Sequence, residues 1–406
     1  MVRKPGLIVF TNVNSFLGGK KWFFDEISQL VMHFEVSIFT HERIPEISKE
    51  EVKKYQIECL GSNLKIRLQN LFLITRVYFT PLIKEFFQKK VYKNRYWIKG
   101  WLLCLKQIHF YGGSSFFNKI KELNADETII YFYWGNEAIM LAPILKKIGF
   151  NKIVSRFHGF DLYNHRLGGY QPLKERILRS LFMALPISDH GKKYLETVYS
   201  KVPLKIRTHY LGTKPLETFP VKINGPLTIV SCSSVIELKR VELIAQVILS
   251  CKFPIEWTHI GDGPQYDSVK SIVIQKNNPQ IKCELLGWVS PDQIQEIYLS
   301  NYFDLFINAS TTEGLPVSIM EAFAAKIPVI APDIGGIAEI VINNYNGKLL
   351  KKDFTADDLA NAICYFNGLP YNAVNLLREN AFNTFQSKFN IDVNSKKLCD
   401  TFLENL

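Results

Sequence analysis

The sequence has few cysteines and no long apolar run, and each shortage excludes a class of protein. Seven cysteines occur among 406 residues, and none forms a Cys-x-x-Cys pair. We therefore expect reduced, mostly buried thiols and neither a disulfide framework nor a zinc site. No stretch of about 18 uncharged apolar residues is present, and the first residues lack the pattern of a secretory leader. We expect a cytoplasmic, globular protein without a membrane span or signal peptide.

The positive charge is confined to one segment. The formal net charge is +11, and residues 64–121 carry all of this excess, with 12 basic residues against the single acid Glu85. Aromatic and aliphatic residues alternate with these charges, which fits a helix lying on the anionic inner face of the cell membrane. Alternatively, the aromatic residues fill a core and the lysines are solvated. Nucleic acid would also attract this charge, but no nucleic-acid-binding motif accompanies it.

A regular alternation of short apolar runs with helix-length segments predicts parallel sheets. The runs are residues 7–13, 34–40, 128–134, 152–157 and 182–187 in the first half, and 227–232, 255–260, 281–286, 303–308 and 327–331 in the second. Strands that alternate with helices form βαβ units whose sheet is covered on both faces. We therefore predict an α/β fold with two Rossmann-like, doubly wound domains.

The domain boundary is expected near residues 212–226, where turn-favouring residues gather. Residues 1–213 would form the N-terminal domain, with the basic aromatic segment 64–121 as an insertion. Residues 214–388 would form the C-terminal domain, and residues 389–406 a helix that packs back on the N-terminal domain. Ligands of open parallel sheets bind at the carboxyl ends of the strands, so two facing sheets predict one interdomain cleft.

The most specific local pattern lies at residues 308–325, Asn-Ala-Ser-Thr-Thr-Glu-Gly-Leu-Pro-Val-Ser-Ile-Met-Glu-Ala-Phe-Ala-Ala. A strand ends near Asn308, and Pro316 suits the first position of a helix. The free amides at the start of that helix would bind an anion such as a diphosphate. Glu321 lies inside the otherwise apolar helix, where a carboxylate needs a partner. A ribose diol is one such partner, and a solvated surface glutamate is the alternative.

Glu313 and Glu321, with seven residues between them, are followed by a Gly-Gly-x-x-Glu run at residues 335–339. This pattern resembles the donor-site motif of retaining GT-B glycosyltransferases of family 4, strongly over residues 229–350 and faintly over most of the chain. The resemblance implies a GT-B architecture, with an N-terminal acceptor domain and a C-terminal nucleotide-sugar donor domain. It also implies that Glu313 contacts hydroxyls of the donor sugar and that Glu321 binds the ribose. The backbone that would hold the sugar and phosphate belongs to Gly314, Leu315, Pro316 and Val317.

Basic residues in the stretch after residue 232 also resemble a motif of the same family. Lys239 aligns with the family lysine that neutralises the leaving diphosphate, which makes it a catalytic candidate beside Glu313. The family usually has an arginine where this chain has Ser234. Arg240 is a candidate for that second charge, and a helix-surface arginine is the alternative.

Two further loops resemble parts of the family's nucleotide pocket. Gly261 and Gly263 match the glycine turn that lines the pocket, although a glycine pair after a strand can be a mere tight turn. Val289 belongs to the stretch whose backbone reads the base. The neighbouring Trp288 could equally be a core residue.

The first domain offers two further matches. His158, at a predicted strand end and followed by a glycine, resembles the family histidine that reaches toward the donor sugar; a structural histidine is the alternative. Gly18 and Gly19 resemble the glycine loop that lets the backbone approach phosphate or acceptor. Lys20 and Lys21 follow where the family often has an acid, and an acceptor bearing phosphate would suit them.

The sequence contains no Asp-x-Asp triplet, so the usual metal clamp on a sugar nucleotide is not supported. We expect no metal and no cofactor beyond a UDP- or GDP-linked sugar donor, whose charge Lys239 and backbone amides would meet. The resemblance implies a hexosyltransferase that acts on a saccharide or lipid-linked saccharide in bacterial surface-polysaccharide biosynthesis, peripheral on the inner membrane face. A GT-B-like sugar-nucleotide epimerase and a catalytically silent GT-B-like scaffold are the alternatives. The sequence leaves the donor base, the acceptor and the oligomeric state open.

Overall fold

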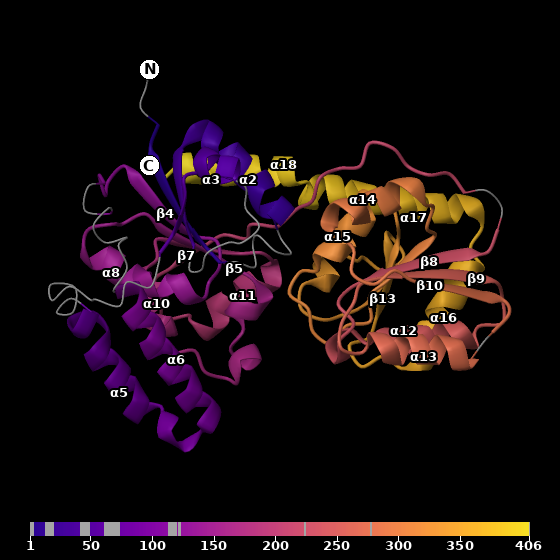
Figure 1. Cartoon of the computed structure of the whole chain (residues 1–406), viewed down its shortest axis with the longest axis horizontal. Coiled ribbons are helices and arrows are strands. Elements are labelled where there is room, and N and C mark those ends of the chain that lie inside the picture. Colours follow the sequence, from indigo (N-terminus) through magenta and orange to yellow (C-terminus); the bar gives the residue numbers. More distant parts are fainter. Residues whose placement is uncertain are drawn as a thin grey trace. The chain divides into compact units, whose positions relative to one another are not determined.

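The computed structural model describes residues 4–12, 20–40, 49–60, 74–112, 120, 123–222, 225–276 and 278–405. The chain folds into two compact units (Figure 1), of which unit 1 comprises Met1–Tyr210 with Ser395–Leu406, and unit 2 comprises Leu211–Asn394. The first division therefore falls after residue 210 and not after 213. The second falls at Ser395, inside the C-terminal helix, and not at residue 389.

Unit 1 is built on a seven-stranded parallel sheet with the order β3-β2-β1-β4-β5-β6-β7. Its strands are β1 (Gly6–Thr11), β2 (Glu35–Thr40), β3 (Ile57–Cys59), β4 (Thr128–Phe132), β5 (Ile153–Phe157), β6 (Met183–Pro186) and β7 (Lys205–Ile206). In β1, Ile8 and Phe10 join one hydrophobic cluster while Leu7 and Val9 join another, because successive side chains of a strand point to opposite faces. Both faces are covered, which explains why these strands read as uninterrupted apolar runs.

Helices cover both faces of this sheet. They are α2 (Lys20–His33), α3 (Lys49–Lys54), α5 (Thr80–Gln88), α6 (Arg95–Gly112), α8 (Ala142–Lys147), α9 (Gly159–Leu162), α10 (Lys174–Ser180) and α11 (Asp189–Val198), with short turns η1 (Thr75–Phe79), η2 (Val91–Lys93), η3 (Glu137–Leu141) and η4 (Asn164–Leu167). The C-terminal helix α18 (Ile391–Leu403) buries Leu398, Cys399 and Phe402 in the core of unit 1. The Phe402 ring meets the rings of Phe34 and Tyr131 edge-on. The end of the chain thus completes the first core.

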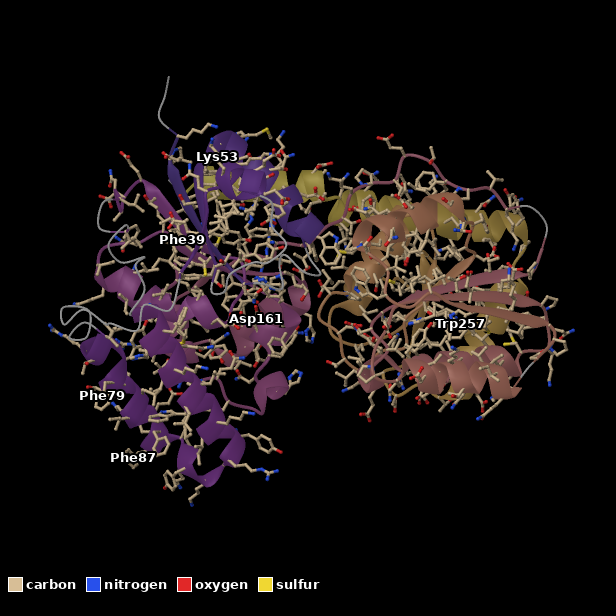
Figure 2. The ribbon with its side chains drawn as sticks, in the orientation of Figure 1. Phe39, Lys53, Phe79, Phe87, Asp161 and Trp257 are labelled. Carbon is tan, nitrogen blue, oxygen red and sulfur yellow. The ribbon has the colours of Figure 1, made fainter. Side chains whose placement is uncertain are left out.

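Residues 75–112, which we call the helical hairpin, hold the described part of the basic aromatic segment. On its inner side, Leu82 and Cys104 join the core, and Trp101 donates a hydrogen bond from Nε1 to the carbonyl of Leu82. On its outer side, Phe79 and Phe87 are 54% and 64% exposed and project into solvent (Figure 2). Some aromatic residues of the segment therefore fill the core while others stay exposed. None of the helices in the described ranges has the length and apolar character needed to cross a membrane.

Unit 2 contains a six-stranded parallel sheet with the order β10-β9-β8-β11-β12-β13. Its strands are β8 (Leu227–Cys232), β9 (Ile255–Ile260), β10 (Ile281–Leu285), β11 (Leu305–Ile307), β12 (Val329–Pro332) and β13 (Gly347–Leu350). Its helices are η5 (Glu237–Lys239), α12 (Val241–Ser250), α13 (Tyr266–Lys276), α14 (Pro291–Ser300), α15 (Val317–Ala324), η6 (Ile337–Glu339), α16 (Ala356–Asn367), α17 (Tyr371–Thr384) and η7 (Phe385–Phe389). The Trp257 side chain is fully buried in this core (Figure 2).

Both sheets reverse their strand order beside their first strand, between β1 and β4 in unit 1 and between β8 and β11 in unit 2. In doubly wound sheets, ligands bind at this switch point, outside the carboxyl ends of the strands. The predicted fold class, two doubly wound parallel α/β domains, is confirmed. In unit 2, the loops after β8 and β11 therefore form the expected ligand-binding edge of the sheet.

Candidate active site

The loops after β8 and β11 meet at the switch point of unit 2. The backbone N–H of Thr311 donates a 2.8 Å hydrogen bond to the carbonyl of Leu238, which ties the two loops together. Lys239 ends the short η5 turn, and Glu313 lies in the loop before α15. The fold therefore brings together two residues that are 74 positions apart in the sequence.

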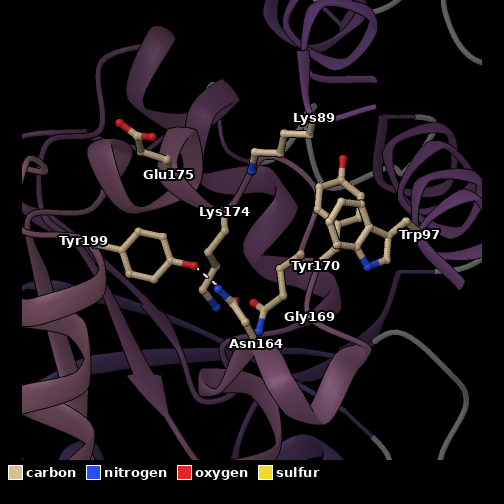
Figure 3. Close-up of a pocket in the computed structure, with 9 residues that line it drawn as sticks. Lys89, Trp97, Asn164, Gly169, Tyr170, Lys174, Glu175 and Tyr199 are labelled. Carbon is tan, nitrogen blue, oxygen red and sulfur yellow. Dashed lines mark hydrogen bonds between the residues drawn. The ribbon is translucent and has the colours of Figure 1, made fainter. Parts of the chain in front are cut away.

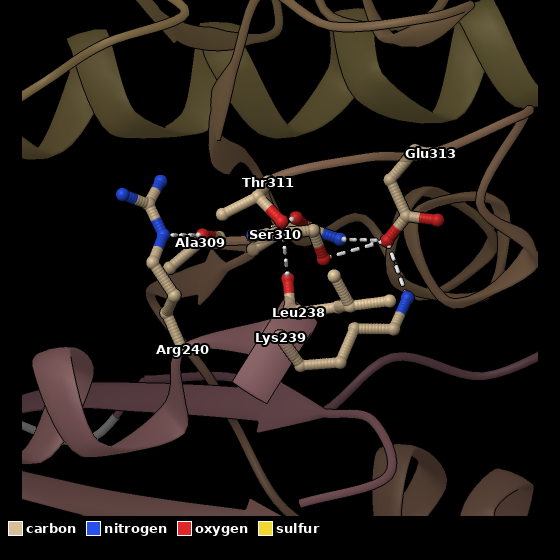
Figure 4. A network of polar contacts seen from close by, with 8 residues as sticks. Leu238, Lys239, Arg240, Ala309, Ser310, Thr311 and Glu313 are labelled. Atoms are coloured by element: carbon tan, nitrogen blue, oxygen red, sulfur yellow. Dashed lines mark hydrogen bonds and ion pairs between the residues drawn. The ribbon is translucent and has the colours of Figure 1, made fainter. Parts of the chain in front are cut away.

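Lys239 and Glu313 form an ion pair in this loop cluster (Figure 4). Lys239 Nζ lies 2.5 Å from Glu313 Oε1, and the same oxygen accepts hydrogen bonds from Ser310 Oγ at 2.7 Å and Asn308 Nδ2 at 3.3 Å. The side chains are 25% and 10% exposed, so a ligand at the sheet edge can reach both. Three donors hold the carboxylate in one orientation. The ammonium uses one of its three donors in this pair, and it is placed to receive a second anion.

The glycines of the pocket motif allow three loops to approach closely. Gly261 has φ +144°, and a Cβ there would lie 1.9 Å from the carbonyl oxygen of Ser233. At Gly263 a Cβ would lie 2.6 Å from the carbonyl oxygen of Val235. Gly335, after β12, has φ +55°, and its Cβ would lie 2.1 Å from the carbonyl oxygen of Glu313. These loops pack backbone to backbone around the Lys239–Glu313 pair, which only glycine permits.

Glu321 lies in the middle of α15 and is buried. Burial raises the pKa of the Cys232 thiol at the end of β8, and the nearby Glu321 carboxylate raises it further. Because Glu321 is 7% exposed, the solvated-surface alternative is excluded. Pro316 precedes α15 as its N-cap, with Val317 as the first helical residue. The prediction that Pro316 is the first residue of the helix was wrong by one position.

Arg240 points away from Lys239 (Figure 4). Its Nε donates a 2.6 Å hydrogen bond to the carbonyl of Ala309, and its guanidinium lies 4.2 Å from the centroid of the Phe354 ring. The backbone of Arg240 is left-handed, with φ +51°. The hydrogen bond and the ring contact connect Arg240 to the loop after β11 and to a core residue, Phe354. Arg240 is partly buried and so is not the solvated surface arginine considered from the sequence, and its role as a second charge for the diphosphate stays a prediction.

The loop after β10 adjoins the glycine turn. Gly261 N donates a 2.8 Å hydrogen bond to the carbonyl of Gly287, and Val289 follows in the same loop, partly buried. Trp288 is 72% exposed. The alternative that Trp288 is a core residue is therefore wrong, and its indole is accessible at the edge of this loop.

His158 follows β5 in unit 1 and is buried against Trp134, with ring centroids 4.0 Å apart. Asp161 accepts hydrogen bonds from the backbone N–H of His158 at 2.6 Å and of Gly135 at 2.7 Å. The carboxylate thus joins the loops after β4 and β5. The imidazole is fixed at the carboxyl edge of the first sheet. Gly18 and Gly19 lie outside the described residues.

The sequence motifs predict Lys239 and Glu313 as site residues, but they do not single out the hydrogen-bond partners Asn308 and Ser310, which lie within residues 308–325. Trp134, directly beyond β4, was missed as well. Short polar residues just after a strand, and any residue following the fourth strand of a Rossmann order, are signals that could have found them. The described residues contain no group of three or more His, Cys, Asp or Glu side chains that could hold a metal ion.

The structure brings Lys239, Glu313 and the glycine turns together within unit 2. His158 lies at the corresponding edge of unit 1. The meeting of these two sets in one interdomain cleft stays a prediction.

Comparisons with known proteins agree with this geometry. Residues 217–382 match the family described as Glycosyl transferases group 1, and the matched stretch contains the Lys239–Glu313 pair. Solved structures of the GT-B class share the whole fold. Among them, an Anabaena protein, HepE, in complex with UDP matches with a TM-score of 0.69 and 14% identity, over 99% of this chain and all of that one (100%). The architecture is GT-B.

Several relatives by sequence are named as glycosyltransferases of bacterial polysaccharide biosynthesis. A protein of Escherichia coli K12, WcaL, provisionally named as a colanic acid biosynthesis glycosyltransferase, is 25% identical over 68% of this chain and 69% of its own length. The amylovoran biosynthesis glycosyltransferase AmsK of Erwinia amylovora is 28% identical over 56% of this chain and 58% of its own length. The family match and these names together support a glycosyltransferase activity for the chain.

Proposed function

We propose that the chain is a retaining glycosyltransferase of family 4 type. It transfers a hexose-type sugar from a nucleotide diphosphate sugar to a saccharide acceptor, lipid-linked, in bacterial surface-polysaccharide biosynthesis. The observation that carries this proposal is the Lys239–Glu313 pair, held at the switch point of unit 2, within the residues that match the group 1 glycosyltransferase family. Such a pair offers one cation for a diphosphate and one carboxylate for sugar hydroxyls at the same edge of the sheet.

The proposed reaction uses the groups of this edge in distinct roles. Lys239 and the free amides at the start of α15 stabilise the charge that develops on the diphosphate as its bond to the sugar breaks. Glu313 and His158 hold the donor sugar. The departing phosphate oxygen takes the proton of the acceptor hydroxyl, whose oxygen bonds to the anomeric carbon on the same face. Glu321 binds the ribose, and no step requires a metal.

Nucleotide binding tests the donor site. We expect UDP to raise the melting temperature of the full chain in excess EDTA, because lysine and backbone amides balance the diphosphate charge. At 100 times its Kd a ligand adds about 2.7 kcal/mol to the free energy of unfolding. Glu321→Ala should weaken this stabilisation at least about tenfold in apparent Kd, since a charge-assisted hydrogen bond contributes about 1.5–3 kcal/mol. The same measurement with GDP in place of UDP shows which nucleotide base the donor site prefers.

Stabilisation that vanishes in EDTA and returns with manganese or magnesium would contradict the metal-free proposal. A chain stabilised by neither nucleotide would contradict the donor site itself and favour the silent scaffold. Nucleotide binding without hydrolysis or transfer of any sugar, but with interconversion of sugar nucleotides, would favour the epimerase.

We further propose that the protein docks on the inner membrane face through the helical hairpin. The exposed side of the hairpin carries Phe79, Phe87 and Tyr96, and the basic residues Lys89, Lys90, Lys93 and Arg95 are exposed at its tip. Aromatic rings favour the headgroup level, and anionic lipid attracts each nearby basic residue by about 1 kcal/mol. A surface with both features fits an anionic bilayer.

Co-sedimentation with vesicles that contain anionic lipid tests this docking. We expect the wild type to bind at low salt and to dissociate at high salt, because surface charges are screened. Changing Lys89, Lys90, Lys93 and Arg95 to glutamine should lower binding by at least about tenfold. The matched control changes four exposed lysines of unit 2 to glutamine, namely Lys252, Lys270, Lys351 and Lys352. Equal loss in both variants would reduce the effect to net charge and refute the hairpin as the docking surface.

A further inference from the structure

Two neighbouring cavities of unit 1 share the side chain of Lys174. The first has a volume of about 330 Å³ and is lined by Lys89, Trp97, Asn164, Tyr170, Lys174 and Tyr199, among others (Figure 3). The second, also of about 330 Å³, lies between α6 and the loops after β4 and β5. Tyr170, Gln171 and Lys174 line both cavities. The two spaces therefore adjoin at a buried ammonium group.

Lys174 is an incompletely paired buried cation. It is 4% exposed, its Nζ donates one hydrogen bond, of 2.9 Å, to the carbonyl of Asp161, and the same Nζ lies 4.6 Å from the centroid of the Phe157 ring. Within the described residues it makes no ion pair, and the nearby Asp161 carboxylate accepts hydrogen bonds from the backbone N–H groups of Gly135 and His158. Burial lowers the pKa of Lys174 to about 8, although the charge of Asp161 opposes this shift. A buried charge needs a partner, and an anion in either cavity would supply it.

The first cavity has an aromatic wall and a second lysine, Lys89, whose Nζ pairs with Glu85 Oε1 at 3.2 Å, and Glu175 also lines it. The rings of Trp97 and Tyr170 lie with centroids 5.2 Å apart, and Lys89 Nζ lies 5.3 Å from the centroid of Tyr170. Opposite this wall, the Tyr199 hydroxyl donates a 3.1 Å hydrogen bond to Asn164 Oδ1. Such a combination of flat apolar faces, hydroxyl, amide and ammonium groups suits a polar headgroup with a negative charge.

The second cavity is mainly apolar. Leu103, Cys104, Met140 and Ile177 line it, together with the backbone of Gly100 on α6. Burial raises the pKa of the Cys104 thiol to about 12, so this side chain acts as an apolar wall. A Cβ at Gly100 would meet nothing within 4 Å, which leaves the helix surface open at this point. The cavity is suited to an apolar chain.

We propose that the two cavities together bind a phosphate ester of an apolar alcohol. The ammonium group of Lys174 holds the phosphate, the groove beside Gly100 holds the apolar chain, and the wall of Trp97 and Tyr170 contacts the rest of the headgroup. The identification of this amphiphile as the acceptor rests on the proposed function. The binding of the amphiphile itself does not.

Calorimetric titration of the full chain separates the two halves of this ligand. The probes are inorganic phosphate, octyl phosphate and octyl glucoside, the last two below their micelle concentrations. We expect octyl phosphate to bind at least about tenfold more tightly than either other probe, because it alone fills both the cation site and the groove. Equal affinity for inorganic phosphate would mean a free-anion site, and equal affinity for octyl glucoside would mean an apolar groove alone. Either result overturns the proposal.

One variant changes the phosphate-binding half of the site, and a second changes the groove for the apolar chain. Lys174→Gln should weaken octyl phosphate at least about tenfold and leave octyl glucoside unchanged, since only the charge is lost. Gly100→Leu fills the groove and should weaken both octyl ligands while sparing inorganic phosphate; it replaces a helical glycine, so the fold should gain stability. The control Lys99→Gln removes a charge from the same helix outside both cavities and should change nothing.

If both Lys174→Gln and Gly100→Leu bind octyl phosphate as tightly as the wild type, the ligand binds outside these two cavities and the proposal is wrong. Stabilisation by UDP, measured on the same variants, reports on unit 2 separately. A wild-type chain that binds UDP but not octyl phosphate counts against this inference alone, and one that binds octyl phosphate but not UDP counts against the donor site alone.

Discussion

Lys239→Gln is expected to lower the rate of sugar transfer by about a hundredfold or more. Removing one preorganised group that stabilises developing charge typically costs about 10² to 10³ in kcat. The ammonium lies 2.5 Å from Glu313 Oε1, so the change removes the cation for the diphosphate and also one of the three donors that orient the carboxylate. Transfer of radiolabelled sugar to the acceptor, or hydrolysis of the sugar nucleotide, measures the effect.

The same unit offers a closely matched control. Lys222 pairs with Asp304 at 2.7 Å, and the side chains are 26% and 5% exposed, compared with 25% and 10% for Lys239 and Glu313. This second pair lies at the amino end of β8, where Asp304 also accepts from Thr228 N, away from the switch point. Lys222→Gln should therefore lower the free energy of unfolding and leave kcat near the wild-type value. Equal losses of kcat in both variants would show that Lys239 acts only through the stability of unit 2.

The interior strands of both sheets could be predicted from the sequence, and three edge strands could not. Each predicted apolar run overlaps a strand of the structure. The missed strands β3 (Ile57–Cys59), β7 (Lys205–Ile206) and β13 (Gly347–Leu350) all lie at sheet edges. They are short and only partly buried. An edge strand pairs on one side only, so tertiary context selects these residues more than their own apolar pattern does.

The candidate site was predictable as separate motifs but not as an arrangement. The chemistry of Glu313 and Lys239 can be anticipated from their motifs, yet their contact requires the loops after β8 and β11 to meet. The backbone of Arg240 is left-handed, and no local sequence pattern predicts this conformation. In the helical hairpin, the sequence shows aromatic residues at mixed spacing. Only the packing decides that Trp101 lies against the core while Phe87 faces solvent.

Gly335→Ala is expected to disrupt the donor site, because the added methyl group meets the backbone of Glu313 itself. Gly335 has φ +55°, a conformation that costs a residue with a side chain about 1–3 kcal/mol. The added Cβ would also lie 2.1 Å from the carbonyl oxygen of Glu313, and the neighbouring Gly336 N–H donates a 2.7 Å hydrogen bond to the carbonyl of Gly314. The turn that carries Glu313 must therefore move, and both kcat and the stability of unit 2 should fall.

The size of the Gly335→Ala effect can be judged against a glycine without these contacts. We expect Gly335→Ala to lower the free energy of unfolding by at least about 2 kcal/mol, from backbone strain and the displaced turn together. At Gly368, the C-cap of α16, φ is −87°, and an added Cβ would lie 3.6 Å from the carbonyl oxygen of Cys364 and 3.7 Å from that of Tyr365. Gly368→Ala should therefore leave stability within about 1 kcal/mol and kcat unchanged. Denaturant unfolding and transfer assays on both variants give the comparison. Wild-type turnover in Gly335→Ala would mean that the Glu313 turn tolerates displacement, and the proposed contact between Glu313 and the donor sugar would then lose its geometric basis.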